Sequence, residues 1–265
     1  EDITNKKQIN EIVDKHQPTI FINFAAESHV DNSIKASEQF IITNVVGTHV
    51  LLEIYRQYSN SRAGTKFIQI STDEVFGDLK PYDQPFCEQS KYDPRNPYSA
   101  SKASSDHLVL SYINTYALPL LLTNCTNNYG PNQYEEKLIP KTIKSIMKGD
   151  KITIYGKGDN IRDWIFVDDH IEALLSTVIK GKIGNSYCIG ASEQLTNLNV
   201  VQDICNLLDQ YLPKSTSYSC LITLVEDRLG HDQRYAIDST RLQQEIGWKP
   251  RYSFEQGLQL TVKWF

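Results

Sequence analysis

The stretch Thr19-Ile-Phe-Ile-Asn-Phe24 decides the fold class, because it is a short apolar run bounded by Pro18 and by small residues. Such a run is typical of a strand that is buried on both faces of a parallel sheet. Two similar runs follow it in the chain: Lys66-Phe-Ile-Gln-Ile70 and Leu120-Leu-Leu-Thr123. Three segments with helical patterns alternate with these runs: residues 5–16, 30–58 and 98–116. The alternation predicts an α/β fold, with a doubly wound, Rossmann-type parallel sheet.

The pattern becomes less regular after about residue 130. Helical patterns cover residues 138–148, 167–179 and 200–211, and short strand patterns cover residues 151–155 and 186–189. We therefore expect residues 1–130 to form the sheet domain. We expect residues 131–265 to form mainly a smaller α+β lobe, with some chain returning to the first domain. A cleft between the lobe and the strand ends is the expected ligand site.

Composition excludes several classes of function. The net charge is −5 and no basic block stands out, so neither nucleic acid nor an anionic membrane surface is an expected partner. No run approaches the ~18 apolar residues of a membrane span. The five cysteines include no C-x-x-C pair and the six histidines show no ligand spacing, so we expect no metal site. An odd number of cysteines favours a reducing compartment, and a cytoplasmic location is expected.

The segment Tyr98-Ser-Ala-Ser-Lys102 places a phenol and an ammonium on one helix face. A nearby lysine cation is expected to lower the pKa of a tyrosine, and the phenolate can then take a proton from a sugar hydroxyl. A Y-x-x-x-K spacing is also common on surface helices. Taken alone, it does not establish function.

A second polar segment, Ser71-Thr72-Asp73-Glu74, follows the apolar run 66–70. Open α/β sheets place their sites at the carboxyl ends of strands. Two adjacent carboxylates suit acid and base chemistry if their environments separate their pKa values. On local grounds a helix N-cap explains the same residues equally well.

Eight sequence blocks occur in an order that resembles a known family. They are Phe24-Ala-Ala-Glu-Ser-His-Val-Asp31, Ser71-Thr-Asp-Glu-Val-Phe-Gly77, Asn96-Pro-Tyr-Ser-Ala-Ser-Lys102, Asn127-Asn-Tyr-Gly-Pro131, Glu136-Lys-Leu-Ile-Pro140, Ile154-Tyr-Gly-Lys-Gly158, Arg162-Asp-Trp164 and Asp227-Arg-Leu-Gly-His-Asp-Gln-Arg234. Together they resemble the dTDP-glucose 4,6-dehydratases, which are NAD-dependent enzymes of the extended short-chain dehydrogenase type and act in deoxysugar and rhamnose synthesis. The Asp-Glu pair after Thr72 distinguishes dehydratases from the related 4-epimerases.

The resemblance implies a lyase reaction with NAD as cofactor and dTDP-glucose as substrate. Tyr98, assisted by Lys102 and Thr72, would remove the C4 hydroxyl proton while the C4 hydride passes to NAD. Glu74 would then take the C5 proton, and Asp73 would protonate the departing C6 hydroxyl. Return of the hydride to C6 and addition of a proton at C5 would give dTDP-4-dehydro-6-deoxyglucose. The resemblance also implies a homodimer, for which the helices at 30–58 and 98–116 are suitable interface elements.

The resemblance assigns further contacts residue by residue. Cofactor contacts would come from Asp2, Ile3, Phe24, Ala25, Ala26, Glu27, Ser28, Thr43, Tyr98, Lys102 and Asn128. Substrate contacts would come from Ser28, Thr72, Asn127, Lys137, Leu138, Thr153, Tyr155, Arg162, Asn197, Asp227, Arg228 and His231. Arg162 and Arg228 suit a diphosphate, and a simple ion pair of Arg162 with the adjacent Asp163 is an equal alternative. His29 and His231 are expected to pack or to form hydrogen bonds, not to act as acid or base.

Three departures from the family pattern qualify these expectations. No G-x-G-x-x-G turn opens the chain, so we expect an N-terminally truncated Rossmann sheet that binds NAD poorly and turns over little. Phe76 stands where tyrosine is usual, and Leu229 stands where proline is usual. Two alternatives remain open: a UDP-glucose 4,6-dehydratase, and a truncated, non-catalytic nucleotide-sugar-binding relic.

Overall fold

The protein is described by a computed structural model that covers residues 1–265. Its main sheet has four strands in the order β1-β2-β3-β7. They are β1 (Ile20–Asn23), β2 (Lys66–Thr72), β3 (Leu120–Cys125) and β7 (Ser186–Ile189), and all three pairings are parallel. The parallel sheet predicted from the apolar runs is therefore confirmed.

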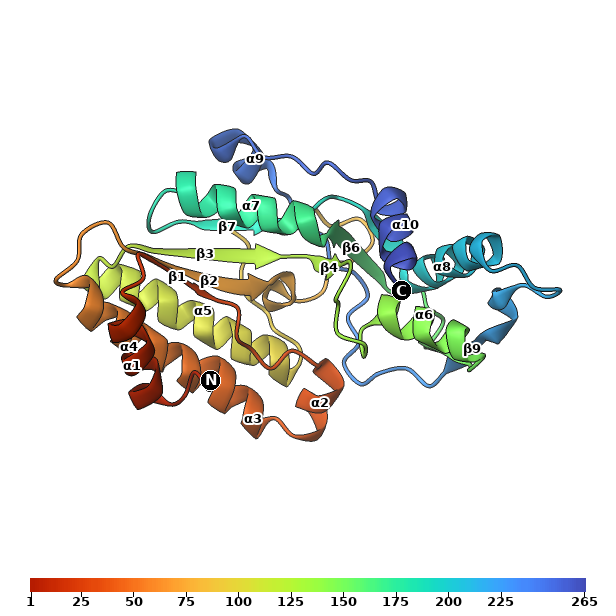
Figure 1. Cartoon of the computed structure of the whole chain (residues 1–265), viewed down its shortest axis with the longest axis horizontal. Coiled ribbons are helices and arrows are strands. Elements are labelled where there is room, and N and C mark those ends of the chain that lie inside the picture. Colours follow the sequence, from red (N-terminus) through yellow and green to blue (C-terminus); the bar gives the residue numbers. More distant parts are fainter.

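Helices cover both faces of this sheet (Figure 1). On one face lie α4 (Thr48–Ser59) and α5 (Pro97–Tyr116), and on the other lie α7 (Val167–Lys180) and α9 (Thr240–Ile246). Successive side chains of a strand point to opposite faces, so Phe67 packs with α4 and α5 while Ile68 packs with α7. The first helix, α1 (Lys6–His16), packs on the outside of α4 through Ile9 and Val13.

The expectation of a single helix over residues 30–58 is wrong, because the structure divides this segment into several helical elements. A short α2 (Val30–Lys35) ends at Ala36, where φ is −150°. The chain then continues through α3 (Glu38–Phe40) and a π-helical segment η1 (Ile41–Gly47) into α4. Gly47 is in close contact with Ile3, since a Cβ at Gly47 would lie 2.5 Å from the Ile3 Cδ1 atom. This tertiary contact leaves no room for an ordinary side chain at that point.

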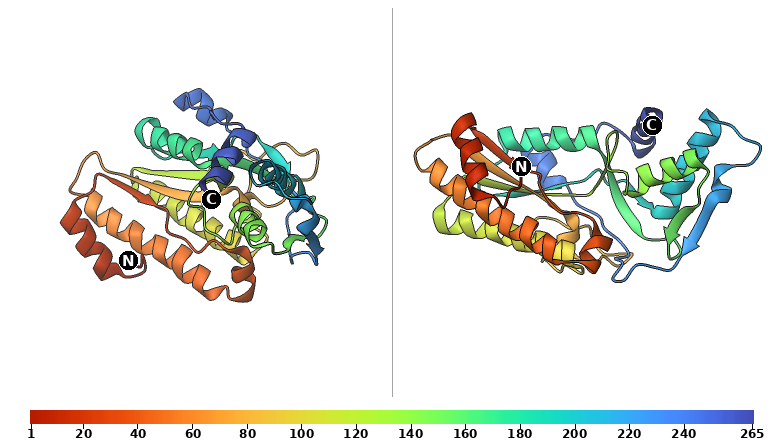
Figure 2. Two further views of the ribbon diagram at one scale, coloured as in Figure 1. Left: turned by 45° about the vertical axis from the view of Figure 1, so that its right-hand side comes forward. Right: turned by 60° about the horizontal axis from the view of Figure 1, so that its bottom comes forward.

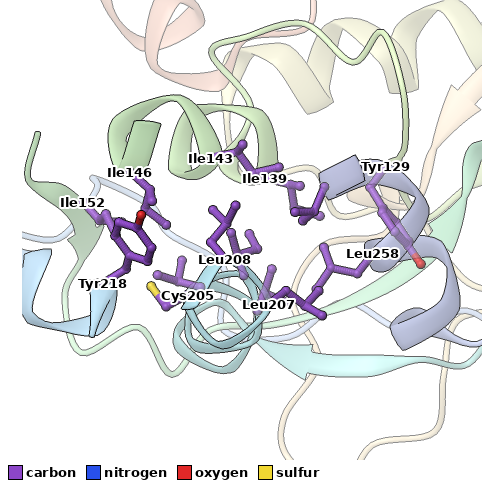
Figure 3. Packing of buried hydrophobic residues seen from close by; sticks show 14 of the residues in the cluster. Tyr129, Ile139, Ile143, Ile146, Ile152, Cys205, Leu207, Leu208, Tyr218 and Leu258 are labelled. Carbon is purple, nitrogen blue, oxygen red and sulfur yellow. The ribbon is translucent and has the colours of Figure 1, made fainter. Parts of the chain in front are cut away.

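The second lobe has its own core of 18 buried residues. It contains α6 (Leu138–Lys148), β5 (Ile152–Tyr155), α8 (Asn197–Tyr211), η3 (Tyr218–Leu221), β9 (Ile222–Val225) and α10 (Phe254–Trp264). Figure 3 shows Ile139 and Ile143 of α6 facing Leu207 and Leu208 of α8. The pairing of β5 with β9 and the helix α10 were not predicted from sequence.

A small three-stranded sheet lies between the main sheet and the second lobe. It has the order β4-β6-β8, with β4 (Asn127–Tyr129), β6 (Ile161–Phe166) and β8 (Gln194–Thr196). Figure 2 shows the second lobe projecting beyond the end of the main sheet. Polar residues gather where β2 and β3 end, next to β4. None of the helices combines the length and the apolar character needed to cross a membrane.

Candidate active site

The start of α5 fixes the position of Tyr98 and Lys102. Asn96 and Ser99 form a reciprocal capping box, and Pro97 occupies the first helical turn. Tyr98 and Lys102 therefore lie in successive turns, and both are buried. The Lys102 ammonium donates to the Ile70 carbonyl at 2.7 Å, which fixes it beneath the end of β2.

The end of β2 carries the two carboxyl groups. The Thr72 hydroxyl accepts a hydrogen bond from the Glu74 backbone N–H at 3.3 Å and donates to Asp73 Oδ1 at 3.2 Å. Thr72 is thus the N-cap of η2 (Asp73–Phe76), so the helix-cap interpretation of this segment holds. It does not exclude a site, because Thr72, Asp73 and Glu74 line the same pocket as Tyr98 and Lys102.

The two neighbouring carboxyl groups have different environments. Asp73 is 2% exposed, and burial, Glu74 and Asp163 raise its pKa well above the ordinary value. Burial also raises the pKa of Glu74, but the cations Arg162 and Lys137 act in the opposite direction. Asp73 is therefore the better proton donor of the pair, and Glu74 is the better proton acceptor.

The pKa expected for Tyr98 is corrected by the structure. Burial raises the pKa of the phenol well above 10, and the negative charge of Glu74 adds to the effect. The Thr72 hydroxyl opposes it through a hydrogen bond. The Lys102 ammonium, which donates to the Ile70 carbonyl, does not outweigh burial. Sequence spacing identified the neighbouring cation but could not give the degree of burial.

Arg162 lies at the junction of the main pocket with the second lobe. Its guanidinium donates to the Ile161 and Asp232 carbonyls at 2.8 and 3.0 Å and lies 4.4 Å from the Tyr235 ring centroid. The suggested ion pair with Asp163 is wrong. Adjacent residues of β6 point to opposite faces, and the Asp163 carboxyl accepts instead from the Glu193 N–H at 3.0 Å.

A second arginine connects the two sides of the cleft. Arg228 Nε lies 2.6 Å from Asp31 Oδ1 of α2, and the guanidinium lies 5.1 Å from the Tyr155 ring centroid on β5. The Tyr155 phenol also donates to Asp31 at 3.2 Å. Burial acts to raise the pKa of Asp31, but the hydrogen bond and charge of Arg228 outweigh it and the pKa is lowered. This contact spans the mouth of the cleft.

The two histidines named from sequence both form polar contacts. His29 caps α2 by accepting from the Asn32 N–H at 3.3 Å. The His231 imidazole lies 2.7 Å from the Asp227 carboxylate, and burial lowers the pKa of His231 despite that contact. Neither side chain lies in the pocket that holds Tyr98.

Three adjoining pockets form one continuous cleft, since Asn127 and Lys137 line all of them. Most of the residues predicted to bind ligand line this cleft: Phe24, Ala26, Ser28, Thr72, Asp73, Glu74, Tyr98, Lys102, Asn127, Asn128, Lys137, Leu138, Thr153, Tyr155, Arg162, Asn197, Arg228 and His231. Six do not line it: Asp2, Ile3, Ala25, Glu27, Thr43 and Asp227.

Three of these six residues, Asp2, Ile3 and Thr43, contact other residues of the protein. The Asp2 carboxylate accepts from Thr4 at 2.8 Å, and Ile3 packs against Gly47. Thr43 accepts from Gln39 at 3.0 Å. The roles predicted for these residues remain predictions.

The cleft also contains residues that sequence reasoning missed. Asn96, Gln133, Glu136, Asp232 and Tyr235 line it. Gln133 lies between two of the quoted sequence blocks, and its Oε1 atom is buried without a partner. Tyr235 lies one residue beyond the last block. Inclusion of a few residues on either side of each block would have found both Gln133 and Tyr235.

The chain is similar to proteins named as 4,6-dehydratases. The family described as GDP-mannose 4,6 dehydratase matches residues 1–261. Proteins named dTDP-glucose 4,6-dehydratase from Salmonella typhimurium and Escherichia coli are each 48% identical to the chain, over 100% of it and 77% of their own length. A solved dTDP-glucose 4,6-dehydratase from Bacillus anthracis, in complex with NAD, is 40% identical with a TM-score of 0.88, over 100% of this chain and 77% of its own. The corresponding enzyme from Streptomyces venezuelae, solved with NAD bound, is 36% identical with a TM-score of 0.90 and the same coverage.

Proposed function

The chain belongs to the GDP-mannose 4,6 dehydratase family, and we propose that it catalyses the NAD-dependent dehydration of dTDP-glucose to dTDP-4-dehydro-6-deoxyglucose. One observation carries this proposal beyond family membership. A phenol, an ammonium, a hydroxyl and two carboxyl groups line one pocket at the carboxyl ends of the strands.

The proposed proton transfers follow from the environments of these groups. Tyr98 takes the proton of the sugar C4 hydroxyl, with the Thr72 hydroxyl and the Lys102 ammonium stabilising the phenolate. The C4 ketone makes the C5 proton acidic, and Glu74 removes that proton. Asp73, whose pKa burial raises, gives its proton to the C6 hydroxyl, and water leaves.

The pocket fits the nicotinamide end of NAD. It is lined by Phe24 and Ala26 just after β1, and the buried Asn128 Oδ1 atom has no hydrogen-bond partner in the protein. Phe24 and Ala26 would flank the cofactor, and Tyr98 and Lys102 would hold its ribose. When bound, NAD supplies the acceptor for the C4 hydride and the donor that returns it to C6.

The outer part of the cleft suits the nucleotide diphosphate. Arg162, Arg228 and Lys137 bring three cations to its wall in a chain of net charge −5. Tyr155 on β5 offers an aromatic face at the same wall. These groups support a dianionic ligand with a planar base.

The decisive experiment incubates the protein with dTDP-glucose and NAD. Formation of the 4-keto sugar is then measured by its absorbance in alkali. Glu74→Gln is expected to lower kcat by a factor of about a hundred or more, because it removes the base at C5. Lys157→Gln, at an exposed position outside the cleft, is the matched control and should retain full activity. Absence of product from the unsubstituted chain would contradict the proposal. A faster rate with UDP-glucose would reassign the substrate.

We further propose a homodimer in the cytoplasm. Exposed Ile41, Ile42 and Val46 on η1 support an interface there, and five free cysteines suit a reducing compartment. Light scattering on the purified protein would test the dimer.

A further inference from the structure

One buried carboxyl group that has no role in the proposed reaction lies beside the Tyr98–Lys102 pair. Asp106 is 0% exposed, and it follows Lys102 by four residues on the same face of α5. It lines none of the three pockets of the cleft, so it does not contact substrate. Any effect of Asp106 on catalysis must therefore act through a neighbouring residue.

The hydrogen bonds of Asp106 connect α5 to the ends of two strands. Its Oδ2 atom accepts from Ser71 Oγ of β2 at 2.6 Å and from Asn124 Nδ2 of β3 at 3.4 Å. It also accepts from the Tyr92 phenol at 3.1 Å. The Asn124 amide in turn donates to the Thr72 carbonyl at 3.1 Å. The carboxyl group thus joins the helix that carries Tyr98 to the strand end that carries Thr72.

The carboxyl group of Asp106 acts on the charge of Lys102, which lies one helical turn before it on α5. Burial raises the pKa of Asp106 to about 6, while Lys102 and the three donors favour its ionised form. Its Oδ1 atom is buried without a hydrogen-bond partner, so part of the charge is left uncompensated. Burial lowers the pKa of Lys102, and Asp106 is the main group that opposes this change.

The other titratable groups around this pair are two thiols, a phenol and an imidazole, and none of them is a carboxyl group. Burial raises the pKa of Cys125 on β3 to about 12, and it also raises the pKa of Tyr92 and of Cys188 on β7. His107 is exposed, and its ring lies tilted against the Tyr92 ring with the centroids 5.2 Å apart. Asp106 is therefore the anion that faces Lys102 from the protein side.

We propose that Asp106 is a positioning residue: it keeps Lys102 charged beside Tyr98 and ties α5 to the strand end that carries Thr72. The inference rests on the proposed dehydratase function for its catalytic consequence. The coupling between the two side chains can be measured independently of that function.

The first test follows the titration of Lys102 by NMR in protein whose lysines carry carbon-13 at Cε, with the Lys102 signal assigned by its loss in Lys102→Met. Asp106→Asn is expected to lower the pKa of Lys102 by about one unit or more. Ser71→Ala keeps the carboxyl group but removes its shortest hydrogen bond, so it should give a smaller shift in the same direction. If Asp106→Asn does not fold, the pKa of Lys102 measured in Ser71→Ala decides whether the proposal holds.

The matched control is Asp169→Asn. Asp169 is also 0% exposed and accepts from the Arg251 N–H at 3.1 Å, but it lies on α7. The Asp169→Asn substitution should leave the pKa of Lys102 unchanged. An unaltered Lys102 titration in both Asp106→Asn and Ser71→Ala would overturn the proposal.

The second test uses the dehydration assay. Asp106→Asn should lower kcat with little change in KM, and the alkaline limb of the kcat profile should move to lower pH, because Lys102 loses its proton sooner. A purely structural role would lower kcat equally at every pH. If the unsubstituted chain forms no keto sugar, the proposed function fails while the NMR titration still decides the Asp106 inference.

Discussion

At the scale of single residues, the site depends on carboxyl groups that the fold removes from water. Asp73, Asp106 and Asp163 are each at most 2% exposed. A buried carboxyl group remains protonated to a higher pH than an exposed one. This property suits Asp73 to the proton-donor role proposed for it, and it also makes the stability of the fold depend on pH.

Asp163 gives the clearest test of that dependence. Burial raises its pKa to about 7, above the value of about 3.9 in an unfolded chain. A raised folded-state pKa contributes stability that is fully present below the unfolded-state value and is lost as the pH rises through about 7. Between about pH 5 and pH 7.5, the free energy of unfolding of the parent should therefore fall relative to that of Asp163→Asn by about 2 kcal/mol. Urea unfolding at the two pH values measures this change, and a constant difference would contradict it.

Part of the residue-level site was predictable. The four-residue spacing placed Tyr98 and Lys102 on one face of α5, and the position after a buried strand placed Thr72, Asp73 and Glu74 at the strand end. The same spacing rule would have found Asp106, four residues further along the helix. The raised pKa of Tyr98 was not predictable, because burial depends on residues distant in sequence, such as Phe40, whose ring packs against the phenol at 6.4 Å.

At the scale of elements, the short helix η2 determines where the two carboxyl groups point. It ends at Gly77, where φ is 90° and ψ is −150°, a region that only glycine adopts readily. A Cβ at Gly77 would also lie 2.5 Å from the Asp93 carbonyl oxygen. The turn that follows the site therefore requires glycine both for its backbone conformation and for lack of space.

Gly77→Ala is expected to lower the free energy of unfolding by about 3 kcal/mol, and to lower kcat because η2 must shift. Gly64→Ala is the control: its φ is +82°, but a Cβ there would meet nothing within 4 Å. That substitution should cost about 1 kcal/mol and leave kcat unchanged. Equal losses of stability in the two variants, measured by urea unfolding, would show that the Asp93 contact does not matter.

Elements differed in how well the sequence predicted them. The strand β3 was found because it begins with three consecutive leucines, a run typical of burial on both faces. The strand β6 was missed because Arg162 and Asp163 interrupt its apolar pattern, and its partners lie more than 25 residues away on both sides. The π-helical η1 was missed because the helical sequence pattern of residues 30–58 runs through it without a break.

At the scale of the whole molecule, the Asp31–Arg228 ion pair joins the first domain to the second lobe across the cleft. A diphosphate that binds Arg228, as proposed, would compete with Asp31 for the guanidinium. Asp31→Asn is therefore expected to tighten the binding of thymidine diphosphate by about threefold to tenfold, equivalent to about 1 kcal/mol. Calorimetry measures the change in Kd.

The control for this prediction is a double-mutant cycle. In an Arg228→Ala background, Asp31→Asn should no longer change the affinity, because the cation for which the two anions compete is gone. The same gain in both backgrounds would show that Asp31 acts through general charge repulsion. Weaker binding in Asp31→Asn alone would show that Asp31 orients Arg228 instead of competing for it.

The order of the main sheet has a consequence for synthesis of the protein. Strand β7 pairs with β3 although it begins 60 residues after β3 ends, and Leu242 and Ile246 of α9 complete the core on the same face. A nascent chain that has left the ribosome only as far as α6 therefore carries β3 with one edge unpaired. At about 5–20 residues per second, that edge stays open for seconds, and chaperones that bind extended apolar segments have that interval in which to protect it.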